Sequence, residues 1–300
     1  MSDRTPSPLR PFPIPVAVIG PGSQAGPDER LNVLPLPQEM STYRPPRLPE
    51  VIPPGARDAA VALLDDFAAG LERWLAGQGE APVVRLGGLD PVVLALINDT
   101  LGQGEVSIRA QGGSGLANID IQETIFAGLW RVQTRADDGG MEDDRLEAAK
   151  IPAIVIARAR AATRCGPLRA ETPAGLMNAP AVLAEINAAA QARSSAPDAD
   201  APAHVINLTL LPMSAEDMGW LGEVLGIGPV SILSRGYGNC RLTSTGLVDT
   251  WWVQYFNSSD ALILNTLEIT ALPDAALAAT EDLVDSLARL RTWARTLLTI

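Results

Sequence analysis

Hydrophobic residues recur along this chain at helical and strand spacings, and each kind of pattern occurs in both halves. One face of a predicted long helix carries Leu64, Phe67, Leu71 and Trp74, and a second helix is expected at about 180–192. The segments VVRL at 83–86 and HVINLTL at 204–210 predict strands that follow these helices. A final helix shows a 3.6-residue apolar stripe formed by Leu283, Leu287, Leu290, Ala294 and Leu297.

The two halves also share sequence. LGQGEVSI at 101–108 matches LGIGPVSI at 225–232, with six identities in eight and an offset of 124. The same offset places Asp90 on Ser214, and both residue types favour the N-cap position of a helix. Further along, WRVQ at 130–133 matches WWVQ at 251–254, where the offset has become 121. Matches on both sides of one length change indicate an internal duplication.

Each copy is therefore expected to run helix, strand, helix, three strands and a closing helix that begins at Pro152 or Pro273. This order predicts an α+β fold with mainly antiparallel sheets, in which two duplicated units pack about a pseudo-twofold axis. Three regions are expected: a Pro-rich extended N-terminal arm at 1–55, a first repeat at 56–165 and a second repeat at 166–300.

The copies differ most in one connection. Copy one has RAQGGSGLANIDIQE there and copy two has LSRGYGNCRLTS, which is three residues shorter. Loops on a rigid scaffold often carry function, so the second loop is the predicted partner-binding site. Its residues are Arg235, Gly236, Tyr237, Gly238, Asn239, Cys240 and Arg241. The structural alternative is that Gly236 and Gly238 only supply positive φ for a tight turn.

Adjacent residues on a strand face opposite sides of the sheet, so Trp251 and Trp252 are expected to point in opposite directions. We expect one of the two rings in the core. The other is a candidate for a partner-facing aromatic.

Charge and composition narrow the classes of function. The formal net charge of −12 disfavours nucleic acid as a partner. No apolar run reaches the roughly 18–20 residues that span a bilayer, and prolines interrupt the only apolar stretch near the N-terminus. We therefore expect neither membrane insertion nor a secretory signal, and a cytoplasmic location.

Few side chains in this sequence are of the types that usually bind transition metals or act as thiol or imidazole catalysts. The only cysteines are Cys165 and Cys240, and the only histidine is His204. They cannot complete a four-ligand iron–sulfur or structural zinc site, so no cofactor, resident metal or catalytic residue is expected. Two alternatives stay open for Cys240. One is a thiol-dependent enzyme that uses Cys240 with His204, and the other is a transient ligand in iron or cluster delivery.

Several long segments resemble the HupH/HyaF family of hydrogenase expression/formation proteins, whose members are also called HoxQ. The resemblance covers nearly the whole chain. It is carried by GPGSQ (20–24), LPLPQEMSTYRPP (34–46), GLMNAPAVLAEI (175–186), HVINLTLLPMS (204–214), ILSRGYGNCRLTST (232–245) and WWVQYFNSSDALILNTLEI (251–269).

The resemblance implies a non-catalytic role in maturing a membrane-bound uptake [NiFe] hydrogenase. It implies two partners, the iron–sulfur small-subunit precursor, held before twin-arginine export, and a thioredoxin-like hydrogenase accessory protein. An acidic chain suits a basic twin-arginine segment. The family resemblance supplies no catalytic residues to carry over.

Overall fold

The computed structural model describes residues 52–112, 117–161, 163–195, 201–236 and 239–299. The predicted arm at 1–55 lies outside the described residues up to residue 51, and the first helix begins at Pro54. The first half contains α1 (Pro54–Leu75), β1 (Val83–Arg85), α2 (Pro91–Leu101), β2 (Val106–Ala110), β3 (Asn118–Glu123), β4 (Leu129–Arg135), β5 (Met141–Ala148) and α3 (Ala153–Ala161).

The second half presents the corresponding order with two short 3-10 turns added. It contains α4 (Ala179–Ser195), β6 (His204–Asn207), η1 (Leu208–Leu210), α5 (Ala215–Leu225), β7 (Ile227–Ser234), β8 (Asn239–Thr245), β9 (Thr250–Phe256), β10 (Leu262–Ile269), η2 (Asp274–Ala276) and α6 (Thr280–Thr299). The strand expected at 204–210 is shorter than predicted. The Asn207 side chain accepts a hydrogen bond from Thr209 N at 3.0 Å and turns the chain into η1.

Local sequence explains where α2 and α5 begin. Asp90 accepts a hydrogen bond from Val92 N at 2.8 Å, and Pro91 follows at the first helical position. Ser214 and Asp217 form a capping box at the start of α5. Both N-cap predictions are confirmed.

The strands form one antiparallel ten-stranded sheet in the order β1-β5-β4-β3-β2-β7-β8-β9-β10-β6. The halves meet at the β2–β7 ladder, where Ile108 pairs with Ile232. The predicted mixture of helices with mainly antiparallel strands is thus confirmed.

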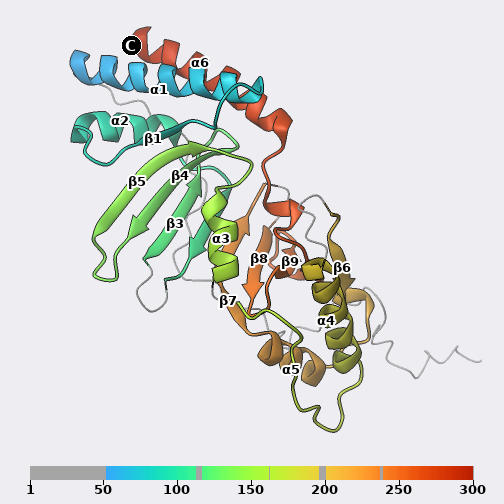
Figure 1. The fold of residues 1–300 in the computed structure, drawn as a ribbon. Coiled ribbons are helices and arrows are strands. Elements are labelled where there is room, and N and C mark those ends of the chain that lie inside the picture. The colour runs from blue at the N-terminus through green and yellow to red at the C-terminus, as the bar shows by residue number, and fades with distance from the viewer. Residues whose placement is uncertain (1–51, 113–116, 162, 196–200, 237–238, 300) are drawn as a thin grey trace, which may run out of the picture.

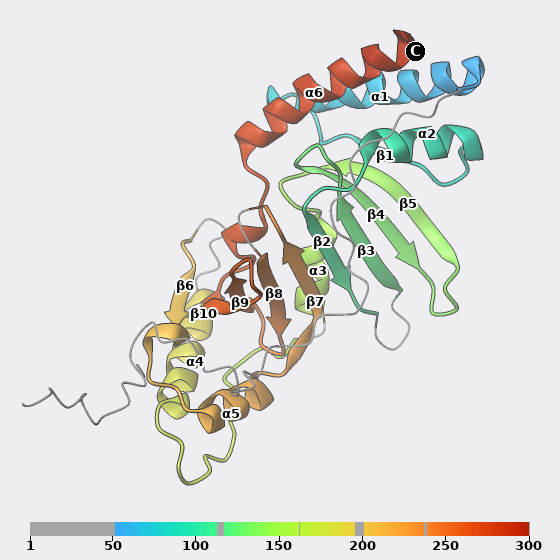
Figure 2. The same ribbon diagram turned by 180° about the vertical axis from the view of Figure 1, so that it is seen from behind.

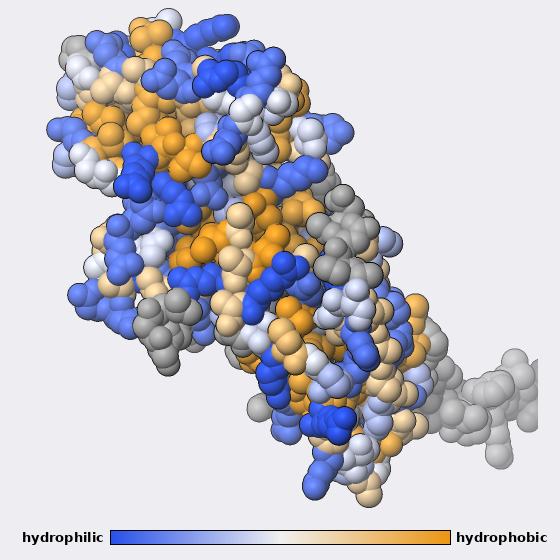
Figure 3. All heavy atoms as spheres, in the orientation of Figure 1, coloured by the Kyte–Doolittle hydropathy of each residue, from blue (hydrophilic) through white to orange (hydrophobic). Residues whose placement is uncertain are grey.

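Helices cover the two faces of this sheet unequally (Figures 1 and 2). On one face, α1 and α2 pack over the first half and α4 and α5 over the second, each pair with its own apolar core. The opposite face has a single core that spans both halves beneath α3. Apolar atoms reach the surface around α3 (Figure 3), because a helix of nine residues leaves Ile154 and Ile156 only partly buried.

The two adjacent tryptophans lie in different cores. Trp251 belongs to the core that spans both halves, whereas Trp252 packs beneath α4 and α5, so the predicted alternation is confirmed. Both rings are buried, at 1% and 3% exposure. The candidate partner-facing tryptophan is therefore wrong for either residue.

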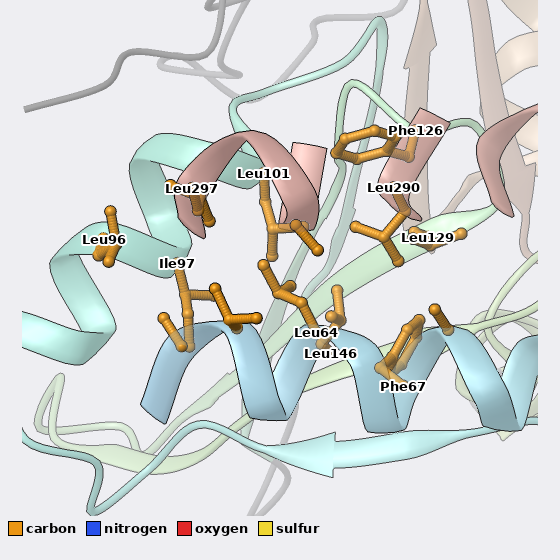
Figure 4. Close-up of a cluster of buried hydrophobic side chains, with 14 of the residues drawn as sticks. Leu64, Phe67, Leu96, Ile97, Leu101, Phe126, Leu129, Leu146, Leu290 and Leu297 are labelled. Atoms are coloured by element: carbon orange, nitrogen blue, oxygen red, sulfur yellow. The ribbon is translucent and has the colours of Figure 1, made fainter. Parts of the chain in front are cut away.

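The last helix does not pack on the second half, so the prediction that a helix beginning at Pro273 ends the second repeat is wrong. Pro273 is the N-cap residue of the short turn η2, whereas α6 begins at Thr280 and crosses to lie beside α1. Its apolar stripe joins Leu64, Ile97 and Leu101 in the first-half core (Figure 4) through Leu283, Leu290, Ala294 and Leu297. Arg291 also makes two hydrogen bonds to the Glu72 carboxylate, at 3.0 and 2.6 Å.

A buried carboxyl lies where α6 meets the sheet. Glu123 is 7% exposed and accepts a hydrogen bond from Gly128 N at 3.1 Å. Gly128 has a φ of +79°, and a Cβ there would approach Leu283 of α6 to 2.3 Å. The pKa of Glu123 is raised to about 7, mainly by burial and also by the nearby carboxylates Glu105 and Asp282, although the hydrogen bond from Gly128 N acts in the opposite direction.

This raised pKa predicts how the stability of the fold depends on pH. Because the folded pKa of Glu123 exceeds its unfolded value, ionisation destabilises the folded protein increasingly from about pH 4.5 to about pH 7. The Glu123→Gln variant keeps an acceptor for Gly128 N without the charge. We expect it to be more stable than the wild type at pH 8, by on the order of 3 kcal/mol, with most of this gain lost by about pH 5.

Urea unfolding across this pH range measures the effect. The control variant is Glu142→Gln, which neutralises an exposed carboxylate and should leave the pH profile of the wild type unchanged. A stability gain in Glu123→Gln that is equal at pH 5 and pH 8 would contradict the assignment.

Candidate functional site

The predicted partner-binding residues lie on the hairpin that joins β7 to β8. Tyr237 and Gly238 fall outside the described residues. The final ladder pair of the hairpin is Ser234 with Cys240, and Arg235 N donates a hydrogen bond to Glu105 O at 3.1 Å. The hairpin is thereby held against the residue that leads into β2.

Gly236 does not have the backbone conformation considered from the sequence. Its φ is not positive, so the expectation of a positive-φ turn residue is wrong at this position. A Cβ at Gly236 would lie 2.6 Å from Oε2 of Glu105. Because Oε2 is the end of a flexible side chain, Glu105 can rotate away from a larger residue, and this contact alone does not make glycine necessary at position 236.

Cys240 points into the core that spans both halves and is 5% exposed. Burial raises the pKa of its thiol to about 12, although a hydrogen bond with the Tyr255 side chain acts in the opposite direction. A nucleophilic cysteine needs a lowered pKa, so this environment favours the thiol rather than the thiolate.

His204 does not assist Cys240. It lies on the edge strand β6, which is separated from β8 by β9 and β10 in the sheet order. At the usual strand spacing this is roughly 14 Å across the sheet. The imidazole Nε2 is instead 2.8 Å from Oε1 of Glu185 on α4, and both side chains are about half exposed. The structure does not assemble the Cys–His pair of the enzyme alternative.

The remaining described hairpin residues make local contacts. The Arg241 guanidinium lies over the Phe256 ring, 4.3 Å from its centroid. Asn239 Nδ2 donates to Asp260 Oδ1 at 3.1 Å, which ties the hairpin to the turn before β10. Arg235 and Gly236 are the hairpin residues that the described structure leaves exposed. Partner binding by this hairpin stays a prediction.

An exposed apolar surface near the hairpin was missed from the sequence. We call it the η1 surface, and it comprises Met177, Leu210, Leu211 and Ile263, which are 69%, 55%, 37% and 48% exposed, respectively. Asn265 N donates to Thr209 Oγ1 at 2.8 Å and holds η1 against β10. Asn178 Nδ2 donates to Pro212 O at 2.7 Å and places Met177 beside the same segment.

Among the described residues, no group of three or more His, Cys, Asp or Glu side chains is arranged to hold a metal ion. The described helices include none with the length and apolar character to cross a membrane.

Comparison with known proteins shows extensive similarity to one family. The model of the HupH hydrogenase expression protein, C-terminal conserved region, matches residues 58–164 and 176–297. The hydrogenase expression/formation protein HupQ of Azotobacter chroococcum mcd 1 is 47% identical over 91% of this chain and 93% of its own. HupH of Rhodobacter capsulatus is 44% identical over 93% of this chain and 96% of its own.

More distant similarities extend this set. The hydrogenase-1 operon protein HyaF of Escherichia coli K12 is 34% identical over 91% of this chain and 93% of its own. The solved structure of the hydrogenase expression protein HupH from Thiobacillus denitrificans is 26% identical over 38% of this chain and 92% of its own, with a TM-score of 0.35.

The environments of the two cysteines predict a large difference in their reactivity. At pH 7.5, iodoacetamide should modify exposed Cys165 readily and leave Cys240 unmodified, because Cys240 is both buried and protonated. Peptide mass spectrometry resolves the two sites. A Cys165→Ser variant should stay unlabelled until it is unfolded in urea. Rapid native labelling of Cys240 would contradict this account and revive the enzyme alternative.

Proposed function

The chain belongs to the HupH hydrogenase expression protein family, and on this basis we propose that it is an accessory factor in hydrogenase maturation. The observation that carries the proposal is the similarity to hydrogenase expression/formation proteins at 44–47% identity over more than nine-tenths of the chain. The names of these relatives favour an accessory role over catalysis. The buried, protonated Cys240 is consistent with that role.

We further propose that the chain holds the iron–sulfur small subunit of a membrane-bound uptake [NiFe] hydrogenase before twin-arginine export. It would do so in the cytoplasm, together with a thioredoxin-like accessory protein. The charge of the chain supports this choice of partner, because a net charge of −12 attracts a segment that carries a pair of arginines.

The proposed contact is the β7–β8 hairpin with the N-terminal arm. Arg235 supports this location, because it is an exposed charged side chain on a hairpin that is anchored at Glu105 and Asp260. Such anchoring fixes the backbone of Arg235 relative to the sheet and reduces the entropy lost on binding.

We also propose that residues 56–165 and 166–300 are duplicated units related by a pseudo-twofold axis, preceded by the arm at 1–55. The strand order supports this, since it lists corresponding strands outward from the β2–β7 ladder. Ile108 and Ile232, which pair there, are separated by the 124 residues of the sequence repeat. Trp130 Nε1 bonds Ala149 O, and Trp251 Nε1 correspondingly bonds Ala271 O.

Co-expression with a tagged small-subunit precursor from the same source tests the function. We expect the two proteins to co-purify, and recovery to fall when the twin-arginine segment is deleted from the precursor. Absence of co-purification, with and without the thioredoxin-like protein, would contradict the small-subunit assignment.

One substitution tests the hairpin location. Arg235→Ala should weaken binding of the precursor by about tenfold, as expected for loss of a central interface arginine. Arg295→Ala is the matched control, because Arg295 is an exposed arginine in the last turns of α6, which packs beside α1 on the first half. Equal affinities of the two variants for the precursor would place the contact elsewhere.

A further inference from the structure

A strip of side chains crosses the middle of the sheet on the face that carries α1, α2, α4 and α5. Ser107 of β2 pairs with Leu233 of β7. Leu233 in turn pairs with Arg241 of β8, and Arg241 pairs with Gln254 of β9. Directly paired residues lie on one face of a sheet, and so do alternate residues of a strand, which adds Phe256. We call these five residues the central strip.

The central strip lies between the two pairs of helices. Trp252, two residues before Gln254 on β9, packs beneath α4 and α5. Toward the other edge, Ser107 is joined through β3 to Arg131 of β4, which makes a hydrogen bond to Asn98 of α2. Figure 2 shows β2 and β7 between α2 and α5, and neither helix lies over them. The helix that packs on these two strands is α3, on the opposite face.

The side chains of the central strip are buried even so. Leu233 and Phe256 are 4% and 3% exposed, yet they belong to none of the three apolar cores. Ser107 and Gln254 are 6% and 2% exposed. Arg241 Nε is also buried, and it has no hydrogen-bond partner among the described residues. This burial indicates that a further segment lies over the strip.

Residues 1–51 are the part of this chain that can provide the cover. Of the shorter segments outside the described residues, 113–116 follows the far end of β2, and 196–200 leads toward edge strand β6. The segment 237–238 adjoins the strip, but two residues extend only about 7 Å. The strip crosses four strands, or about 14 Å. A longer segment is therefore required.

The arm is long enough to reach the strip. It joins the described structure at Ile52, which is 6% exposed in the first-half core. From there α1 starts at the margin of the molecule and runs toward its middle over 22 residues, or about 33 Å (Figures 1 and 2). An extended Pro-rich chain covers that length in about 11 residues. Leu36 precedes Ile52 by 16 residues, so the run LPLP at 34–37 reaches the strip with length to spare.

We propose that the arm crosses the sheet on the central strip, with Leu34 and Leu36 packed against Leu233 and Phe256. Alternate side chains of an extended segment face the same side, about 7 Å apart, so one short run presents both leucines to the sheet. The arm thereby joins the first half, where it continues into α1, to the second half. The inference is independent of the proposed function, because it concerns contacts within one chain.

The polar part of the strip suits the same segment. Pro35 and Pro37 lack N–H groups, so this run presents carbonyl acceptors and leaves few donors to satisfy. The buried Nε–H of Arg241 requires such an acceptor. Leu233 and Arg241 also belong to the strands that the β7–β8 hairpin joins, so an arm on the strip passes beside that hairpin.

Disulfide formation in the full chain tests the contact. The background is Cys165→Ser, which leaves buried Cys240 as the only native cysteine. One cysteine is introduced with Leu233→Cys, and the other with Leu34→Cys or Leu36→Cys. A disulfide needs Cα atoms within about 7 Å of each other, so we expect mild oxidation to join position 233 to one of the two arm positions within one chain. Non-reducing gels and peptide mass spectrometry identify the bond.

The matched control keeps each arm substitution and moves the second cysteine to α6 with Val284→Cys, at a residue that is 54% exposed. This pair should stay reduced. A disulfide that forms only between two chains would make the arm of a second copy the occupant and overturn the contact within one chain. Absence of a disulfide from both arm positions would overturn the proposal altogether.

Thiol protection tests the same contact without a cross-link. In the Leu233→Cys variant of this background, iodoacetamide should label position 233 slowly, because the arm covers it. Adding Leu34→Asp/Leu36→Asp should raise the labelling rate by at least about tenfold, since the cover opens more often. The control Val16→Asp/Val18→Asp adds the same charge to another part of the arm and should leave the rate unchanged. Equal rates in all three proteins would show that another segment covers the strip, which would contradict the proposal.

Discussion

The backbone ladder between β2 and β7 is the interaction on which the rest of this structure depends. Five residue pairs, from Val106 with Ser234 to Ala110 with Val230, join two five-stranded halves into one sheet. Without this ladder each half would expose an unpaired edge strand. The ladder also makes one face continuous, so that Ile108 and Ile232 share a core with residues of both halves. The β7–β8 hairpin therefore extends from the middle of the ten-stranded sheet rather than from one of its edges.

Sequence patterns predicted the local elements well because local chemistry determines them. Asp90 and Ser214 begin helices because their side chains accept hydrogen bonds from free backbone N–H groups of the first turn. The residues involved lie within four positions of each other, so the sequence shows them directly. The alternation of Trp251 and Trp252 follows from strand geometry. The strand expected at 204–210 ended early, because the side chain of Asn207 bonds a backbone group two residues ahead and this competes with strand pairing.

Features set by distant contacts could not be predicted in this way. The apolar stripe of α6 shows that one face is buried, but the stripe does not identify α1 and α2 as its partners. Gly236 lies in a turn, but the positive φ considered for it is not observed, and its neighbour is the carboxylate of Glu105, which is more than a hundred residues earlier in the chain. Exposed Leu210 was placed in the strand predicted at 204–210, because an apolar run does not show that the strand ends at Asn207.

The crossing of α6 back to α1 has a consequence for synthesis of the protein. Translation proceeds from the N-terminus, and domains usually fold in the order in which they emerge from the ribosome. Here the first-half core includes Leu290 and Leu297 of α6, which are made long after α1 and α2. The half that emerges first therefore cannot complete its core until α6 has left the ribosome. The nascent polypeptide must remain soluble with that core open, and a chain terminated before α6 would leave the surface of α1 and α2 uncovered.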